Sequence, residues 1–134
     1  MLTIENTILI VVDAQGRLAR VVAESEAAIE RIGILVQGAK LLGIPTLLTA
    51  QAPEKIGHTI PEIASLLPEQ ADLPRMSFSI WRDQAVRRLC KPLAASKCCF
   101  AALKRIFAFT KVQWICLHRG LKFIWSLMLF LRAG

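Results

Sequence analysis

The stretch Thr7-Ile-Leu-Ile-Val-Val-Asp-Ala-Gln-Gly16 decides the fold class. Thr7–Val12 is a short, continuous and largely β-branched apolar run, which is typical of a strand buried on both faces of a parallel sheet. Asp13 and the polar residues after it begin a loop that contains Gly16. Asp13 is therefore expected at the carboxyl end of a buried strand, where open α/β sheets bind their ligands.

The chain that follows alternates between helix and strand. Residues 24–42 have apolar residues at three- and four-residue steps, and Gly43 with Pro45 ends this predicted helix. Residues 45–50 form a second apolar run, so the unit is β-α-β with a parallel strand pair. Farther along we expect a loop at 51–59, a short helix at 61–67, a strand or loop at 72–79 and a helix at about 81–89.

Composition divides the 134 residues into two unequal parts. Residues 1–89 carry 9 Lys and Arg and all 10 acids, whereas residues 90–134 carry 8 basic residues and no acid. All four cysteines and seven of the nine Phe and Trp also lie in 90–134. The formal net charge of +7 therefore belongs to this tail, and a uniformly basic nucleic-acid-binding domain is excluded.

The cysteines Cys90, Cys98, Cys99 and Cys116 form no CxxC pair and have no matching histidine spacing. We interpret them as incidental thiols and expect neither a disulfide framework nor a metal site. The polar, acidic start of the chain lacks the features of a signal peptide, so a cytoplasmic, reducing compartment is expected.

Asp13 is the first candidate for chemistry. A carboxylate beside an apolar run can be partly desolvated, which makes it a stronger base. The alternative from residue type alone is an aspartate that caps the loop or a helix.

Four segments resemble the isochorismatase-like cysteine hydrolases and cover about residues 5–89, in the order and spacing of that family. These segments are Ile8–Gln15, Leu41–Gln51, Gly57–Ile63 and Arg75–Ser79. The resemblance implies a three-layer α/β/α fold with a parallel sheet, here truncated, and hydrolysis of a small amide or related substrate without a cofactor. It also implies homo-oligomers for intact relatives, with no nucleic-acid partner and no membrane span.

The resemblance assigns roles to two residues of an Asp–Lys–Cys triad. Asp13 matches the aspartate that takes the proton of the nucleophilic cysteine. Arg75 stands where the family has its lysine; it keeps the charge and can hold a carboxylate by two hydrogen bonds, but it cannot give up a proton. Arg75 as a solvated charge before a strand is the alternative, and the role of Gln15, structural or substrate-side, stays open.

The family's nucleophile motif, G-[IV]-x-T-x-x-C-V, is absent after Leu89. A shift of one base restores it: codons compatible with Ala101–Phe109 then read G-I-E-T-H-I-C-V, with the cysteine codon across Phe107 and Ala108. We therefore interpret residues 90–134 as an out-of-frame, mainly helical tail on a hydrolase domain that covers 1–89. Fusion to an unrelated exon and a genuine C-terminal extension are the alternatives.

A rival hypothesis takes the tail at face value. The apolar run Leu121–Leu131 has about 11 residues, whereas a bilayer span needs about 20. With the basic residues and tryptophans around it, the segment could instead lie on an anionic membrane surface or bind single-stranded nucleic acid. A non-catalytic membrane-surface protein is therefore the alternative function.

Overall fold

The computed structural model describes residues 3–21, 24–76, 97–102 and 122–124, together with residues 83, 84, 86 and 88. The strands are β1 Thr7–Val12, β2 Thr46–Gln51, β3 Leu73–Arg75, β4 Lys97–Ala102 and β5 Lys122–Ile124. The helices are α1 Ser25–Leu41, α2 Pro53–Ile56 and α3 Pro61–Ala64, with 3-10 turns at Ile4–Asn6 and Arg17–Arg20.

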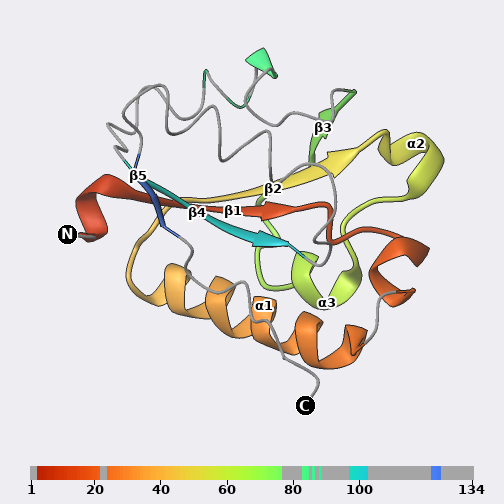
Figure 1. The fold of residues 1–134 in the computed structure, drawn as a ribbon, viewed down its shortest axis with the longest axis horizontal. Helices are drawn as coiled ribbons and strands as arrows, with labels where there is room; N and C mark the ends of the chain where they lie inside the picture. Colours follow the sequence, from red (N-terminus) through yellow and green to blue (C-terminus); the bar gives the residue numbers. More distant parts are fainter. Residues whose placement is uncertain are drawn as a thin grey trace.

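The strands form one five-stranded sheet in the order β3-β2-β1-β4-β5 (Figure 1). All four pairings are parallel. Strand β1 is central, and its last residue, Val12, lies beside Thr49 of β2 and Ala102 of β4. The carboxyl ends of the strands therefore meet at one edge of the sheet, as the sequence predicts for Asp13.

Every residue of β1 is buried. Leu9 and Val11 belong to the core that packs against α1, while Ile8 and Ile10 are fully buried as well. Because successive side chains of a strand point to opposite faces, both faces of β1 are covered. The predicted strand buried on both faces is confirmed.

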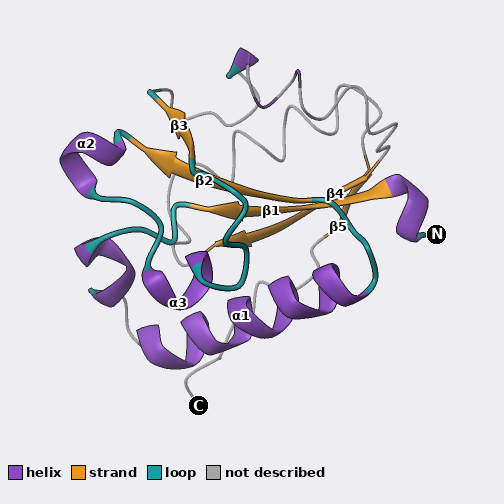
Figure 2. Cartoon of the chain, turned by 180° about the vertical axis from the view of Figure 1, so that it is seen from behind, coloured by secondary structure: helices purple, strands orange, loops and turns teal. Residues whose placement is uncertain are grey.

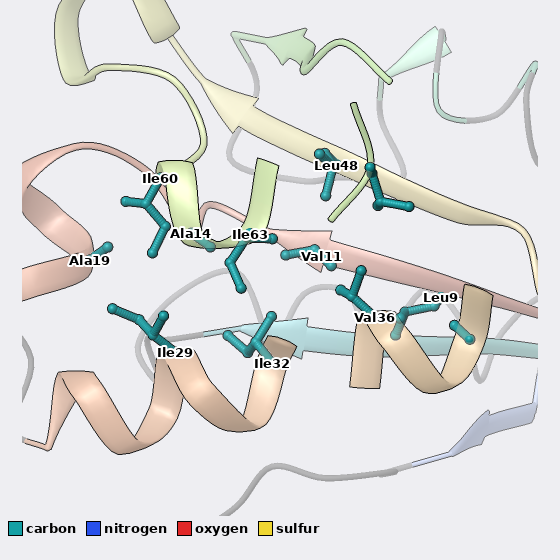
Figure 3. Close-up of a cluster of buried hydrophobic side chains, with 12 residues drawn as sticks. Leu9, Val11, Ala14, Ala19, Ile29, Ile32, Val36, Leu48, Ile60 and Ile63 are labelled. Atoms are coloured by element: carbon teal, nitrogen blue, oxygen red, sulfur yellow. The ribbon is translucent and has the colours of Figure 1, made fainter. Parts of the chain in front are cut away.

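Helix α1 crosses one face of the sheet, with α3 beside it on the same side (Figure 2). Its buried residues lie at helical spacing and meet β1, β2 and the α3 region in one apolar cluster (Figure 3). The members of this cluster on α1 are Ile29, Ile32, Val36 and Ala39.

Gly43 ends α1 as predicted, with a φ of 67°. Its N–H donates to the Lys40 carbonyl at 3.2 Å, and the Ile44 N–H donates to the Ala39 carbonyl at 2.8 Å. This pair of bonds is the Schellman arrangement, which satisfies the last carbonyls of the helix and returns the chain toward β2.

The prediction of a helical tail is wrong in two segments. Lys97–Ala102 and Lys122–Ile124 are the strands β4 and β5, and β4 supplies the ladder partner of β1 over its whole length. The physical reason is that a central strand needs partners for its N–H and C=O groups on both sides, and the apolar run 98–102 can supply them.

Other predictions fall partly or wholly outside the described residues. Of the helix expected at 81–89, residues 84, 86 and 88 are described and are helical. Apart from β4 and β5, the tail that is expected to be helical lies outside the described residues, as do Cys90 and Cys116. Pro53–Ile56, expected within a loop, forms the short helix α2. Within the described part of the chain, no helix is both long and apolar enough to cross a membrane.

Candidate active site

Asp13 directly follows β1 at the carboxyl edge of the sheet. Its backbone has a φ of 52°, the left-handed conformation that aspartate tolerates better than most residues, and its N–H donates to the Thr49 carbonyl at 3.0 Å. Its side chain is 26% exposed. The fold thus sets the carboxylate at the sheet edge, only partly open to solvent.

Arg75 is the last residue of β3 and is only 1% exposed. Its Nη2 atom donates to Oδ2 of Asp13, so the two residues form an ion pair across the end of β2. The structure brings together the two site residues predicted from the sequence. The alternative of a solvated arginine before a strand is wrong, because the guanidinium is buried.

Burial and the neighbouring donors shift the pKa of the Asp13 carboxyl in opposite directions. Burial raises the pKa of the Asp13 carboxyl above its ordinary value of 3.8, while the charge and hydrogen bond of Arg75 and the Gln51 N–H favour ionisation. Burial outweighs the other effects. Asp13 is therefore a stronger base than a solvent-exposed aspartate.

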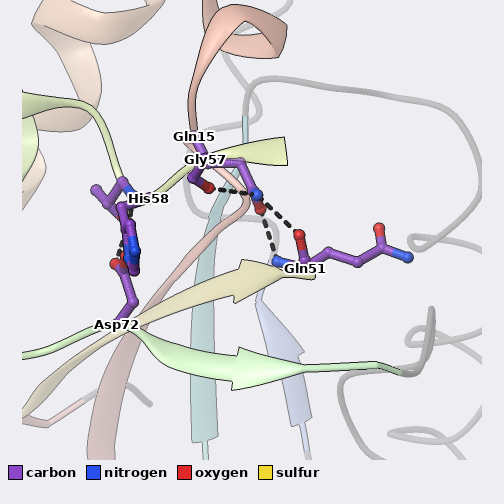
Figure 4. A network of polar contacts seen from close by, with 6 residues as sticks. Gln15, Gln51, Gly57, His58 and Asp72 are labelled. Atoms are coloured by element: carbon purple, nitrogen blue, oxygen red, sulfur yellow. Dashed lines mark hydrogen bonds and ion pairs between the residues drawn. The ribbon is translucent and has the colours of Figure 1, made fainter. Parts of the chain in front are cut away.

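Gln15 is buried, with 1% of its surface exposed, and it connects three segments. Its Nε2 atom donates to the carbonyls of Gln51 and Gly57, each at 2.8 Å, and its Oε1 atom accepts from the Gln51 N–H at 2.6 Å (Figure 4). The role that the sequence left open is structural, because every polar atom of this side chain bonds to backbone.

Asp72 binds two residues of the loop after α2, His58 and Thr59. The carboxylate accepts hydrogen bonds from the Thr59 N–H at 3.0 Å, from the Thr59 hydroxyl and from Nδ1 of His58 at 2.9 Å (Figure 4). Burial acts to raise the pKa of Asp72, but these hydrogen bonds outweigh it and hold the pKa below 3.8. Sequence inspection missed this cluster, because only the fold brings positions 58 and 72 together.

Among the described residues, no group of three or more His, Cys, Asp or Glu side chains is placed to hold a metal ion. Cys98 and Cys99 lie in β4, which pairs with β1 on the side opposite β2. A cavity of about 660 Å³ lies at the opposite, amino-terminal edge of the sheet, where Ile4, Ile34 and Leu42 contribute to its lining. It is therefore separate from the Asp13–Arg75 pair.

No family profile and no curated protein sequence matches this chain. Solved structures do match it. A MAR1 ribonuclease from Caenorhabditis elegans is 24% identical with a TM-score of 0.80, and the match covers 91% of this chain and 62% of that one. The YcaC gene product of Escherichia coli, described as an octameric hydrolase of unknown specificity, is 18% identical with a TM-score of 0.79 and the same coverage.

An isochorismatase from Pseudomonas putida is 13% identical with a TM-score of 0.74, over 91% of this chain and 69% of that one. The chain thus spans 62% of the length of the first two structures. At these identities the likeness concerns the fold, and it agrees with the resemblance seen in the sequence. The chain has the α/β fold of the isochorismatase family.

Proposed function

We propose that residues 1–89 are the amino-terminal part of an isochorismatase-like cysteine hydrolase and that residues 90–134 are read out of frame. The observation that carries this proposal is the ion pair between Asp13 and the buried Arg75 at the carboxyl ends of β1 and β3. The resemblance assigns Asp13 and Arg75 to two members of the catalytic triad, and an ion pair between them supports that assignment. The chain itself is then inactive, because the third member is not encoded in its reading frame.

The position of β4 supports the frameshift. Val12 pairs with Ala102, so the chain leaves β4 at the same sheet edge at which Asp13 follows β1. In the shifted frame, this point begins G-I-E-T-H-I-C-V, and the cysteine codon across Phe107 and Ala108 comes a few residues after the strand. A thiol encoded there would lie a few residues after β4, the strand that pairs with β1, and Asp13 directly follows β1.

The reaction proposed for the frame-restored protein uses no cofactor. Asp13 accepts the thiol proton, the thiolate sulfur bonds to the amide carbon, and the C–N bond breaks as the amine leaves with a proton. Water then hydrolyses the thioester and regenerates the thiol. Arg75 keeps Asp13 in place by charge and hydrogen bonding and transfers no proton itself.

The nucleotide sequence and an activity assay test the proposal together. The real codons, shifted by one base, should give G-I-E-T-H-I-C-V. The present chain should hydrolyse no amide or ester above a control. Inserting one base near codons 86–90 should restore an amidase that Asp13→Ala inactivates and the surface change Glu62→Ala does not.

Two results would contradict this proposal. One is a set of codons that does not encode the motif in the shifted frame. The other is turnover by the present chain that disappears in Asp13→Ala. RNA belongs in the substrate panel because one structurally similar protein is described as a ribonuclease. Binding of the present chain to anionic vesicles, lost when 90–134 is removed, would favour the membrane-surface alternative.

A further inference from the structure

The backbone of Gln51, the last residue of β2, is held from both sides. On the β1 side, its N–H donates to Oε1 of Gln15 at 2.6 Å, and its carbonyl accepts from Nε2 of the same side chain at 2.8 Å. On the β3 side, Gln51 pairs with Arg75, and the next N–H, that of Ala52, donates to the Arg75 carbonyl at 3.0 Å. These bonds fix the backbone from which the Gln51 side chain extends.

The register of the sheet places the Gln51 side chain on the same face as that of Arg75. Paired residues of parallel strands project to the same face, as Val11 and Leu48 do where both join the core that packs against α1. Strand β2 lies between β1 and β3, so the Arg75 side chain passes the end of β2 to reach Asp13. Gln51 stands at that end and is therefore a neighbour of the ion pair.

The side-chain amide of Gln51, unlike that of Gln15, bonds to no other residue in the described part of the chain. Figure 4 shows it extending past the end of β2, away from the Gln15 amide. The residue is half-buried. A primary amide carries two N–H donors and a carbonyl acceptor. On a fixed backbone beside the candidate site, this amide can offer both kinds of group to a ligand.

We propose that Gln51 is a substrate-binding residue whose side-chain amide pairs with an uncharged amide group of the ligand next to Asp13. That the ligand is a substrate rests on the proposed function, whereas the position of the Gln51 amide rests on the register and hydrogen bonds of β2. An amide ligand offers both an acceptor and a donor, so it complements both groups of Gln51 at once. A carboxylate ligand offers acceptors only and adds a negative charge beside Asp13.

Three molecules of nearly the same shape test the proposal on the present chain at neutral pH. Benzamide is neutral, benzoate is an anion and benzamidine is a cation. In an NMR titration, benzamide should shift the side-chain amide signals of Gln51, which are assigned through bonds from its backbone, and benzoate should leave them in place. Gln51→Leu should weaken the binding of benzamide about fivefold, the effect of one lost hydrogen bond.

Gln51→Glu changes the chemistry of the side chain and keeps its shape. The new carboxylate has no donor and carries a negative charge, so the ratio of the two affinities should move from benzamide toward benzamidine by about fivefold. Gln37→Glu is the matched control, because it adds the same charge at an exposed position of α1. It should leave that ratio unchanged.

Benzamide that leaves the Gln51 signals in place, or that binds Gln51→Leu as tightly as the unsubstituted chain, overturns the proposal. The first of these readouts needs no variant, so it decides the matter even where Gln51→Leu fails to fold. Both are independent of catalysis. A frame-restored protein without hydrolase activity would refute the proposed function alone, whereas a frame-restored amidase whose KM is unchanged in Gln51→Leu would refute the role of Gln51 alone.

Discussion

Asp13 and Arg75, 62 positions apart in the chain, form an ion pair across the carboxyl end of β2. The guanidinium is buried, and the carboxylate is about a quarter exposed. Removing one partner of such a pair leaves the other charge poorly solvated, which is more costly than the net value of the pair itself. Because Arg75 is the last residue of β3, this ion pair belongs both to the packing of that strand and to the candidate active site.

The first prediction concerns this ion pair. Arg75→Met should lower the free energy of unfolding by about 3 kcal/mol at neutral pH, the low end of the range for a buried pair because Asp13 keeps some contact with solvent. Arg75→Lys should cost less, since it keeps the positive charge. Urea unfolding followed by circular dichroism measures both changes.

Arg20→Met is the matched control, because Arg20 pairs with Glu62 and both side chains are about half exposed. Its effect should be at most about 1 kcal/mol. Equal losses for Arg75→Met and Arg20→Met would mean that burial of Arg75 does not matter for stability.

The second prediction concerns pH, where the two aspartates act in opposite directions. The pKa of Asp13 is raised in the folded state, so its contribution is fully present below pH 3.8 and is lost as pH rises through the raised pKa. The pKa of Asp72 is lowered, so its contribution is present above pH 3.8 and is lost as pH falls through the lowered pKa.

Comparing each variant with the unsubstituted chain from about pH 3 to about pH 7 separates the two effects. The stability of Asp13→Asn relative to the original should rise with pH, in the window above 3.8. The stability of Asp72→Asn relative to the original should fall with pH, in the window below 3.8. Two curves with the same slope would contradict these assignments.

The pattern of apolar residues was enough to predict β1, α1 and its end at Gly43, because local periodicity and a left-handed glycine determine them. It also placed Asp13 at the sheet edge. It could not settle Gln15, whose partners lie 36 and 42 positions away and meet it only after folding. Burial of Arg75 likewise depends on β3 pairing with β2.

The strands of the tail were missed for a different reason. The apolar tail, residues 90–134, is expected from its sequence to be mainly helical. The local run Lys97–Ala102 carries no strong preference of its own, and the open side of β1 decided its structure. Tertiary context thus decided the structure of a segment that has no strong local preference.

The last prediction concerns Gly16, three residues after Asp13. Its φ of 48° and ψ of −145° lie in a region essentially reserved for glycine, and a Cβ atom there would be 2.1 Å from the Ile56 carbonyl oxygen. Gly16→Ala must therefore displace the 56–57 backbone, which also carries the Gly57 carbonyl that Gln15 binds. We expect the free energy of unfolding to fall by more than about 2 kcal/mol.

Gly38→Ala is the control, because Gly38 lies in α1 with nothing within 4 Å of the added Cβ. It should instead raise the free energy of unfolding by about 0.5–1 kcal/mol from helix propensity. Urea unfolding of both variants measures the difference, and a neutral Gly16→Ala would show that the close approach of the loops after β1 and α2 is not required for folding.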